Sequence, residues 1–461
     1  MRLFWHRRDP RVRDNRGLAT AAADGPVVPV FVRDTDLLDR LGDRQRAFFL
    51  RGVDRLREAY RERGSDLLIR TGRPGEVLPE LAAEFDADGL VYNEHYRPER
   101  RDRQEAVEAA CAEPGVDTAS EPDLVLVDPA RLDERYPTHS QFHDDWEQVS
   151  KPAPAPAPEP DDLADVGGRE TVPVPDADID LPEAGYGAAR EGYDDFLDGG
   201  IRSYGDTRDD LSLAVEAPAQ AVSRLSPYVA AGMIGIREVW RDATEVHDAV
   251  SGDERRNAEK YRYELSWREQ NYHLLYYNPD LPTANYEPFP NGIEWRNDRE
   301  DFEAWKHGET GYPLVDAGMR QLREEGYIHN RPRQVVASFL TKHLLVDWRR
   351  GRRHFAEQLV DHDPASNAGN WQWIASTGTD SVDVRIFDPV AQASKYDDDA
   401  RFVKAYVPEL RDVPAGKVVD WPTLSPDERE RLAPDYPDPI VDRTAAYERA
   451  QRVYERALGK R

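Results

Sequence analysis

Residues 361–373 hold the greatest density of side chains that can do chemistry. The stretch reads Asp361-His362-Asp363-Pro364-Ala365-Ser366-Asn367-Ala368-Gly369-Asn370-Trp371-Gln372-Trp373, with two acids two apart and two indoles two apart. A polar turn that leads into an aromatic wall suits a large, flat cofactor. The same pattern also fits a buried loop entering a helix, with Asp361 or Asn367 as its cap. Spacing alone leaves these two interpretations open.

Residues 261–272 place unlike groups on one face of a predicted helix. Glu264, Trp267 and Asn271 stand at i, i+3 and i+7, so an acid, a flat ring and an amide share that face. Packing alone explains it poorly, because Glu is rarely buried without a partner. We therefore expect a pocket wall for something flat and polar, such as a base.

Two further segments offer groups that bind phosphate. Ser223-Arg224-Leu225-Ser226-Pro227 combines hydroxyls, backbone amides and an Arg, although Ser-Pro is also a common helix start. Residues 329–355 carry seven Lys or Arg and one acid, Asp347, against the acidic background of the chain. A basic face of this kind can bind a nucleic-acid backbone, and the alternative is a solvated helix end.

Together with Arg385-Ile386-Phe387-Asp388-Pro389, these motifs resemble the DNA photolyase/cryptochrome family. The likeness is closest to class I members that repair cyclobutane pyrimidine dimers, and it covers nearly the whole chain. It implies FAD in a helical C-terminal domain, UV-damaged DNA as the partner, electron transfer from reduced FAD under blue light, and no metal. The dimer would have to leave the duplex, and photolyases are themselves a standard example of base flipping.

The resemblance also assigns roles to individual residues. The catalytic residues would be Glu264, Trp267, Asn330 and Asn367. An electron relay would run through Trp371, Trp348 and Trp295, the last nearest solvent. FAD would be held by Tyr204, Ser223, Arg224, Leu225, Ser226, Tyr261, Arg333, Asp361, Asp363 and Asn367. DNA would be contacted by Asn271, Asn330, Arg331, Arg385 and Gln392. Asn367 would face N5 of the flavin, where an amide can hydrogen-bond N5 in either protonation state.

Three alternatives belong to other functional classes. A cryptochrome would sense light without repair; Gln334, where dimer-repairing relatives usually carry Met, favours it mildly. The absence of a long C-terminal extension and the presence of Trp267 and Trp373 disfavour it. Repair of the (6-4) photoproduct would need His at the positions of Asn330 and Gln334. A flavin-free nucleic-acid binder would leave the acids and the amide of residues 361–367 unexplained.

The elements that must position these groups change character along the chain. Short apolar runs at residues 3–5, 27–32, 67–69 and 89–92 alternate with amphipathic helices, which predicts a doubly wound parallel sheet. Trp5-His6-Arg7-Arg8-Asp9-Pro10 follows the first run and resembles the opening of the family's antenna domain. That domain holds a folate or a deazaflavin pigment. Glu99-Arg100 stands where folate-binding members often carry Asn-Glu, so the antenna pigment stays open.

We expect three parts. Residues 1–130 form the α/β antenna domain, residues 131–198 form a connector rich in Pro and acids, and residues 199–461 form an all-α domain that binds FAD. The connector includes the Pro-Ala repeat of residues 152–158, which is typical of an extended spacer. We expect it to wrap over the surface.

Composition bounds the class of protein. The 461 residues carry 89 acids and 62 bases, a net charge of −27, and only eight of the bases are Lys. Acids spread along the chain, with Lys nearly eliminated, are typical of a protein from a halophilic archaeon, whose salt screens like-charge repulsion. The single cysteine, Cys111, cannot form an internal disulfide, and no signal peptide or long apolar run is present. We expect a cytoplasmic protein, a monomer without membrane spans.

Overall fold

The computed structural model describes residues 1–167, 170–379 and 384–460. Its first part is a parallel sheet in the order β3-β2-β1-β4-β5. The strands are β1 (Arg2–His6), β2 (Val27–Arg33), β3 (Leu68–Thr71), β4 (Gly89–Asn93) and β5 (Asp117–Glu121). The helices between them are α1 (Arg16–Ala22), α2 (Thr35–Leu38), α3 (Asp43–Arg61), α4 (Pro74–Glu84) and α5 (Pro98–Ala112). The prediction of a doubly wound α/β part is confirmed.

Alternating side chains of β1 face two different cores. Phe4 packs with residues of α1 and α3 on one face, whereas Leu3 and Trp5 pack with α4 and α5 on the other. This alternation is the two-residue period of a strand, and it explains why an all-apolar run forms a central strand covered on both faces. The strand order reverses between β1 and β4, and such a reversal opens a crevice at the carboxyl ends of the strands.

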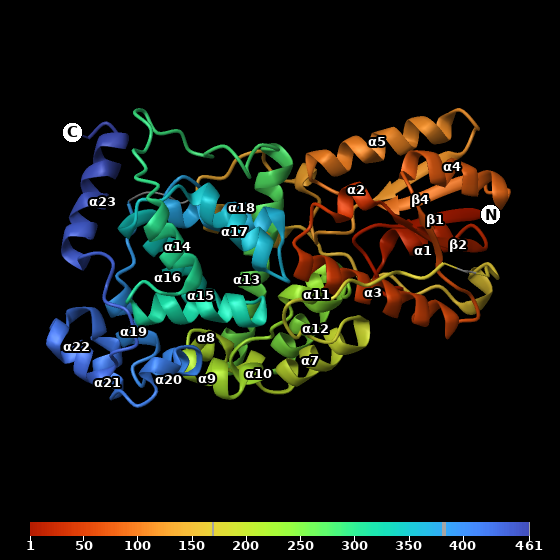
Figure 1. The fold of residues 1–461 in the computed structure, drawn as a ribbon. Helices are drawn as coiled ribbons and strands as arrows, with labels where there is room; N and C mark the ends of the chain where they lie inside the picture. The colour runs from red at the N-terminus through yellow and green to blue at the C-terminus, as the bar shows by residue number, and fades with distance from the viewer. Residues whose placement is uncertain (168–169, 380–383, 461) are drawn as a thin grey trace.

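Helices and the loops that join them make up the rest of the described chain (Figure 1). After α6 (His139–Gln148) come α7 (Tyr186–Asp198), α8 (Tyr204–Thr207), α9 (Leu211–Glu216), α10 (Pro218–Ala221), α11 (Ser226–Ala231), α12 (Ile236–Ala249) and α13 (Gly252–Tyr277). The chain continues through α14 (Arg299–His307), α15 (Pro313–Glu325), α16 (Asn330–Ser338), α17 (Trp348–Gln358) and α18 (Pro364–Ala375). It ends with α19 (Pro389–Tyr396), α20 (Arg401–Tyr406), α21 (Ala415–Val419), α22 (Pro426–Leu432) and α23 (Arg443–Ala457). Every helix among the described residues is too short or too polar to cross a bilayer.

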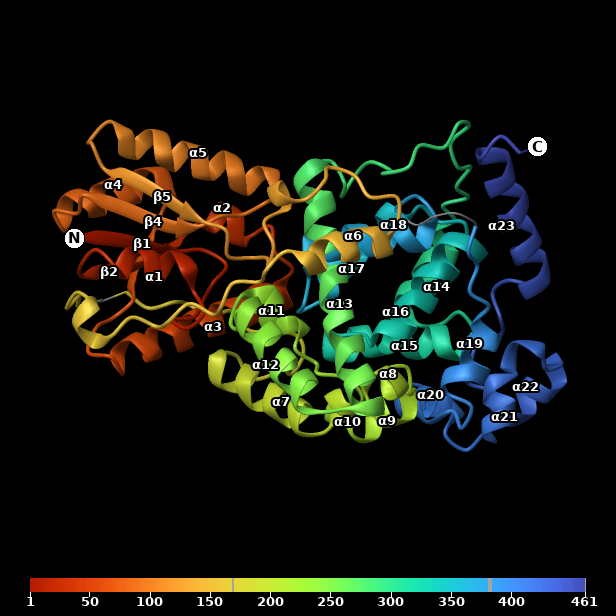
Figure 2. The ribbon, with the colours of Figure 1, turned by 180° about the vertical axis from the view of Figure 1, so that it is seen from behind.

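The connector is pinned to the α/β part at several points. Ala155 exchanges hydrogen bonds with Asp14, the Ala164 amide donates to the Val27 carbonyl, and Asp178 pairs with Arg44 at 2.7 Å. Its first section is not an irregular spacer, because residues 139–148 form α6. This helix lies beside α13 (Figure 2).

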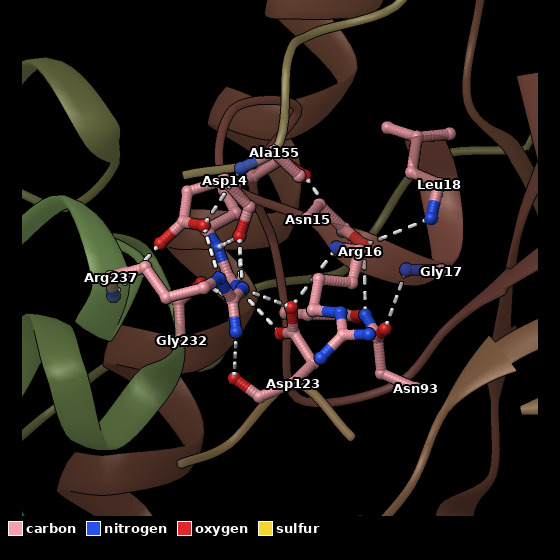
Figure 3. Close-up of polar contacts among 12 residues, drawn as sticks. Asp14, Asn15, Arg16, Gly17, Leu18, Asn93, Asp123, Ala155, Gly232 and Arg237 are labelled. Atoms are coloured by element: carbon pink, nitrogen blue, oxygen red, sulfur yellow. Dashed lines mark hydrogen bonds and ion pairs between the residues drawn. The ribbon is translucent and has the colours of Figure 1, made fainter. Parts of the chain in front are cut away.

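Four buried charges join the α/β part to the helices, and Figure 3 labels three of them, Asp14, Asp123 and Arg237. Arg237, at the start of α12, donates to Asp14 at 2.6 Å and to Asp123 at 2.5 Å, and Arg11 also pairs with Asp123. All four side chains are at most 3 % exposed. Burial alone would raise the pKa of Asp123, but Arg11 and Arg237 outweigh it and lower that pKa. We call Arg11, Asp14, Asp123 and Arg237 the interdomain charge cluster.

Candidate cofactor and substrate site

The first cavity lies between α16, α17 and α18, with about 420 Å³ of space continuous with solvent. It is lined by Asn330, Arg333, Gln334, Ala337, Phe355, Ser366, Asn367, Asn370, Trp371, Trp373 and Ile374. The stretch of residues 361–373 therefore supplies one wall.

An ion pair lies beside this cavity. Arg333 Nη2 is 3.1 Å from Asp361 Oδ2, and Ser226 Oγ donates to the same oxygen at 2.8 Å. Asp361 is 7 % exposed. The structure thus brings Arg333, Asp361 and Ser226 together, although they are far apart in the sequence.

Asp363 is the side-chain cap of α18 and accepts from the Ser366 amide at 2.8 Å. It also accepts from Arg8 at 2.8 Å and from the hydroxyl of Tyr272. Burial alone would raise the pKa of Asp363, but Arg8 and Arg268 hold it far below its usual range. Its carboxylate is therefore engaged with the α/β part, and a contact between Asp363 and a cofactor stays a prediction.

The predicted phosphate-binding residues cluster at the entry to α11. Tyr261 donates to Ser223 Oγ at 3.4 Å, and the Leu225 amide donates to the same oxygen at 3.4 Å. The rings of Tyr204 and Tyr261 are 5.2 Å apart and perpendicular. Arg224 has a left-handed backbone with φ 46° and pairs with Glu325 at 3.0 Å. The buried Arg224 Nε has no hydrogen-bond partner among the described residues.

Glu264, Trp267 and Asn271 share the long helix α13, as the periodicity predicts. Trp267 meets Trp373 edge to face at 6.5 Å, so the two indoles form a corner beside the first cavity. Glu264 is paired with Arg208 and, at 2.7 Å, with Lys260. Asn271 is only 5 % exposed, and a Cβ atom on Gly369 would lie 2.0 Å from its Oδ1. Asn271 therefore fills the contact between α13 and α18, and its contact with DNA stays a prediction.

Sequence reasoning missed His139, which stacks on Trp267. The ring centroids are 3.7 Å apart and the planes differ by 4°. His139 Nδ1 is 2.9 Å from the Tyr263 hydroxyl, and Nε2 is 3.0 Å from Ser266 Oγ. Burial lowers the pKa of His139 to about 3, so the ring is neutral near pH 7. The only sequence signal was a pair of histidines, His139 and His143, one helical turn apart in the connector.

The three tryptophans of the predicted relay differ in exposure. Trp371 is 3 % exposed, Trp348 is fully buried, and Trp295 is half-buried. Among the described residues no ring contact joins them directly. Trp371 instead contacts Phe355 at 5.0 Å and Trp305 at 6.2 Å, and Trp295 contacts Tyr454 at 6.2 Å. The relay stays a prediction, and Trp305 is a further tryptophan in contact with Trp371.

The remaining predicted DNA contacts have mixed surroundings. Asn330 is exposed, and Arg385 is exposed with its guanidinium 4.7 Å from the Trp373 ring centre. Arg331 is bound to Asp209 at 2.6 Å, and Gln392 is half-buried. Of the seven Lys and Arg in residues 329–355, Lys342 is not part of a basic surface, because it is fully buried and donates to the Ala375 carbonyl and Ser376 Oγ. Whether the others bind DNA stays a prediction.

A second cavity opens at the reversal point of the sheet, with about 750 Å³ of space continuous with solvent. It is lined by Trp5, His6, Arg7, Arg8, Phe31, Val32, Asp34, Leu37, Leu38, Leu41, Gln45, Phe49, His95, Arg97, Arg100, Arg103, Ala230, Ala231, His362 and Pro364. Most of these residues follow the carboxyl ends of β1, β2 and β4. Aromatic and aliphatic side chains thus face a group of arginines.

Among the described residues, Arg7 and Arg100 of the second cavity form no ion pair, whereas Arg8 pairs with Asp363. Arg97 pairs with Glu99 and Arg103 with Asp34, but Arg100 is 8 % exposed and its Nε has no hydrogen-bond partner among the described residues. Burial lowers the pKa of Arg100, and Arg97, Arg7 and Arg103 lower it further. A cavity of this kind favours a flat molecule that carries negative charge.

The first cavity fits FAD in the chemistry of its donors. Arg333, Asp361 and Asn367 offer a cation, an anion and an amide to the polar edge of an isoalloxazine, and Trp371 and Phe355 supply flat apolar walls. Arg224 Nε, which has no hydrogen-bond partner in the described part of the chain, lies in the segment predicted to hold phosphates. FAD, when bound, supplies light absorption and electron transfer, and the chain supplies binding and orientation.

Comparisons with known proteins agree with this geometry. Residues 2–161 match the family described as DNA photolyase, and residues 261–456 match the FAD binding domain of DNA photolyase. A deoxyribodipyrimidine photo-lyase of Halobacterium salinarum is 44 % identical, with all of both chains covered.

Solved structures show the same likeness. An archaeal photolyase of Sulfolobus tokodaii, described with two FAD molecules and a novel light-harvesting cofactor, is 31 % identical with a TM-score of 0.83 over 99 % of both chains. A Synechocystis cryptochrome is 26 % identical with a TM-score of 0.88 over 98 % of both chains. An α/β part followed by helices with an FAD-binding domain is thus shared throughout. The chain belongs to the DNA photolyase/cryptochrome family.

Proposed function

We propose that this protein is a deoxyribodipyrimidine photo-lyase that repairs cyclobutane pyrimidine dimers in UV-damaged DNA with light and reduced FAD. The observation that carries the proposal is the corner of Trp267 and Trp373 beside the first cavity, with one face of Trp267 covered by His139. A dimer flipped out of the duplex presents a flat apolar surface, and such a corner can receive it. The 44 % identical halobacterial photo-lyase supports repair over light reception.

The residues divide into three groups in this proposal. The first group holds FAD and consists of Arg333, Asp361, Asp363, Asn367, Tyr204, Tyr261 and residues 223–226. Asn367 lies opposite N5. The electron relay runs from Trp295, nearest solvent, through Trp348 to Trp371 and on to FAD. The third group contacts the lesion and the DNA around it: Glu264, Trp267, Asn330, Arg331, Arg385, Gln392 and Asn271. Glu264 accepts from a pyrimidine N–H, and if it takes up a proton it can donate to a carbonyl that gains negative charge.

The test compares wild type with Trp267→Ala in buffer of high salt. Loss of the stacking surface should weaken binding of dimer-containing DNA about 10- to 100-fold, with little change for undamaged DNA. Glu264→Ala should lower the yield of light-driven repair more than the affinity. The flavin spectrum serves as the control and should stay unchanged in both variants. A wild type that repairs nothing and does not discriminate damaged DNA would reject repair and support a cryptochrome.

We propose a light-harvesting pigment for the second cavity. Its apolar walls and the unpartnered Arg100 favour a flat anionic pigment, a class that includes deazaflavins, flavins and folates. Replacing Arg100 with Met should reduce the pigment that copurifies, and Arg101→Met on the same helix is the matched control. Equal pigment content in both variants would contradict this assignment.

We also propose that the protein is a cytoplasmic monomer divided near residues 130 and 198. The buried, unpaired Cys111 supports a reducing compartment. Light scattering in molar salt measures the mass, and limited proteolysis tests the boundaries.

A further inference from the structure

The carboxamide of Asn367 is held in one orientation by the backbone. Its amide nitrogen lies 3.0 Å from the carbonyl oxygen of Arg352. A backbone carbonyl can only accept, so the atom that faces it must be Nδ2 and not Oδ1. One of the two N–H groups of Asn367 is therefore used, and the direction of the amide is set.

His362 takes the second N–H group. Its Nδ1 atom lies 3.3 Å from the same amide nitrogen. The ring accepts there only as the neutral tautomer that carries its proton on Nε2. Burial lowers the pKa of His362 to about 3, and although Asp363 opposes this, Arg97 and Arg352 add to it. The ring is thus neutral near pH 7 and can accept.

The segment around His362 is fixed on both sides. Asp361 is held by Arg333 and Ser226, and Asp363 is held by Arg8. The His362 carbonyl also accepts from Gln45 Nε2 at 2.5 Å. His362 lines the second cavity while its Nδ1 contacts a residue that lines the first, so it stands in the wall between the two.

Oδ1 is then the only polar atom of the Asn367 side chain with no hydrogen bond to the described residues. We infer that His362 is a positioning residue, which together with the Arg352 carbonyl presents Asn367 Oδ1, and not its N–H groups, to the flavin. This inference rests on the proposed function, which places Asn367 opposite N5. An oxygen accepts from a protonated N5 and repels an unprotonated one. His362 therefore favours the reduced cofactor that repair needs.

The experiment measures the ratio of oxidised to reduced FAD at a fixed solution potential in the dark. His362→Leu removes the acceptor and frees the amide to rotate, so the ratio should rise about 3- to 10-fold, as one hydrogen bond allows. His362→Gln restores a carbonyl acceptor and should return the ratio toward wild type. His354→Leu, which exchanges another half-buried histidine in the adjacent α17, is the matched control and should leave the ratio unchanged.

Each outcome decides the inference. Equal ratios in wild type and His362→Leu would overturn it, as would equal shifts in the Leu and Gln variants, because the acceptor would then not matter. A wild type that binds no FAD would overturn both this inference and the proposed function. A shift in His362→Leu, together with a wild type that binds FAD but repairs nothing, would overturn the repair function alone. The readout needs neither DNA nor light.

Discussion

Trp267 has one face covered by the imidazole of His139, whose centroid lies 3.7 Å away. A flat ligand can therefore stack only on the other face, beside Trp373. The imidazole is itself held at both nitrogens by Tyr263 and Ser266. The stacking surface is thus rigid before a ligand arrives, which lowers the entropy that binding must overcome.

Replacing His139 separates stacking from hydrogen bonding. His139→Leu removes the ring behind Trp267 and should weaken binding of dimer-containing DNA about 2- to 10-fold, the range of one aromatic contact. His139→Phe keeps a flat ring and should bind nearly as wild type does. Binding is measured by fluorescence anisotropy with undamaged DNA as the control. If the Leu variant binds as tightly as wild type, His139 has no part in positioning Trp267.

The sequence predicts the residues that repeat a known motif and misses those whose role depends on the fold. Glu264 and Trp267 could be placed on one helix face from spacing, and Arg333 with Asp361 from resemblance. The roles of His139 and His362 could not be predicted, because they depend on contacts with other elements. His139 stacks on a residue of α13 from the connector. His362 orients Asn367 only together with the Arg352 carbonyl, which accepts from the same amide. Single histidines carry no pattern that indicates such contacts.

At the scale of elements, apolar strands could be predicted and polar ones could not. The runs at residues 3–5, 27–32, 67–69 and 89–92 correspond to β1–β4, but β5, Asp117-Thr118-Ala119-Ser120-Glu121, escaped notice. It is an edge strand whose residues are exposed or half-buried, so it lacks the apolar pattern of a central strand. Helix α6 escaped for a related reason, because the Pro- and acid-rich connector around it suggested irregular chain.

The start of α12 connects the helical part to the α/β part through Arg237, which contacts Asp14 and Asp123. Arg237→Met leaves Asp14 and Asp123 buried without that partner, and the free energy of unfolding should fall by about 3–5 kcal/mol. Arg241→Met, on the same helix, removes an ion pair between the half-exposed Arg241 and the buried Asp242, which keeps Arg190 as a partner, and should cost at most about 1 kcal/mol. Denaturant unfolding in high salt measures both variants. Similar losses would show that the interdomain charge cluster is not a special source of stability.

At the scale of the whole molecule, charge sets the solution behaviour. With −27 spread along the chain, like-charge repulsion destabilises the fold in dilute buffer. Because the Debye length falls from about 10 Å at 0.1 M to about 3 Å at 1 M salt, the melting temperature should rise up to molar salt. Circular dichroism across a salt series tests this expectation. A maximum at low salt would contradict adaptation to concentrated salt.

Acid should unfold the protein through five buried or half-buried histidines. Burial lowers the folded-state pKa of His139 and His362 to about 3 and of His329, His343 and His354 to about 4. The unfolded chain takes up protons near pH 6.5 and the folded chain does not. The stability that these neutral histidines contribute is therefore fully present above about pH 6.5, and it is lost as the pH falls toward 4.

Within that window, each such histidine changes the free energy of unfolding by about 1.4 kcal/mol per pH unit. His343→Leu should reduce the slope of unfolding free energy against pH by about that amount, as measured by denaturant unfolding between pH 4.5 and 6.5 in high salt, a window that follows from the cited shifts. An unchanged slope would show that His343 is protonated in the folded protein.

The position of α6 also determines how members of this family can exchange parts. A recombination point near residue 130, at the end of the sheet, leaves α6 and α13 with the same parent and keeps His139 behind Trp267. A point after residue 150 would instead pair α13 of one parent with α6 of another and place a foreign side chain behind Trp267. Chimeric proteins built for new pigments should therefore inherit α6 together with α13. The segment that is inherited as one piece begins before α6, and not at residue 199, where the helical domain was predicted to begin.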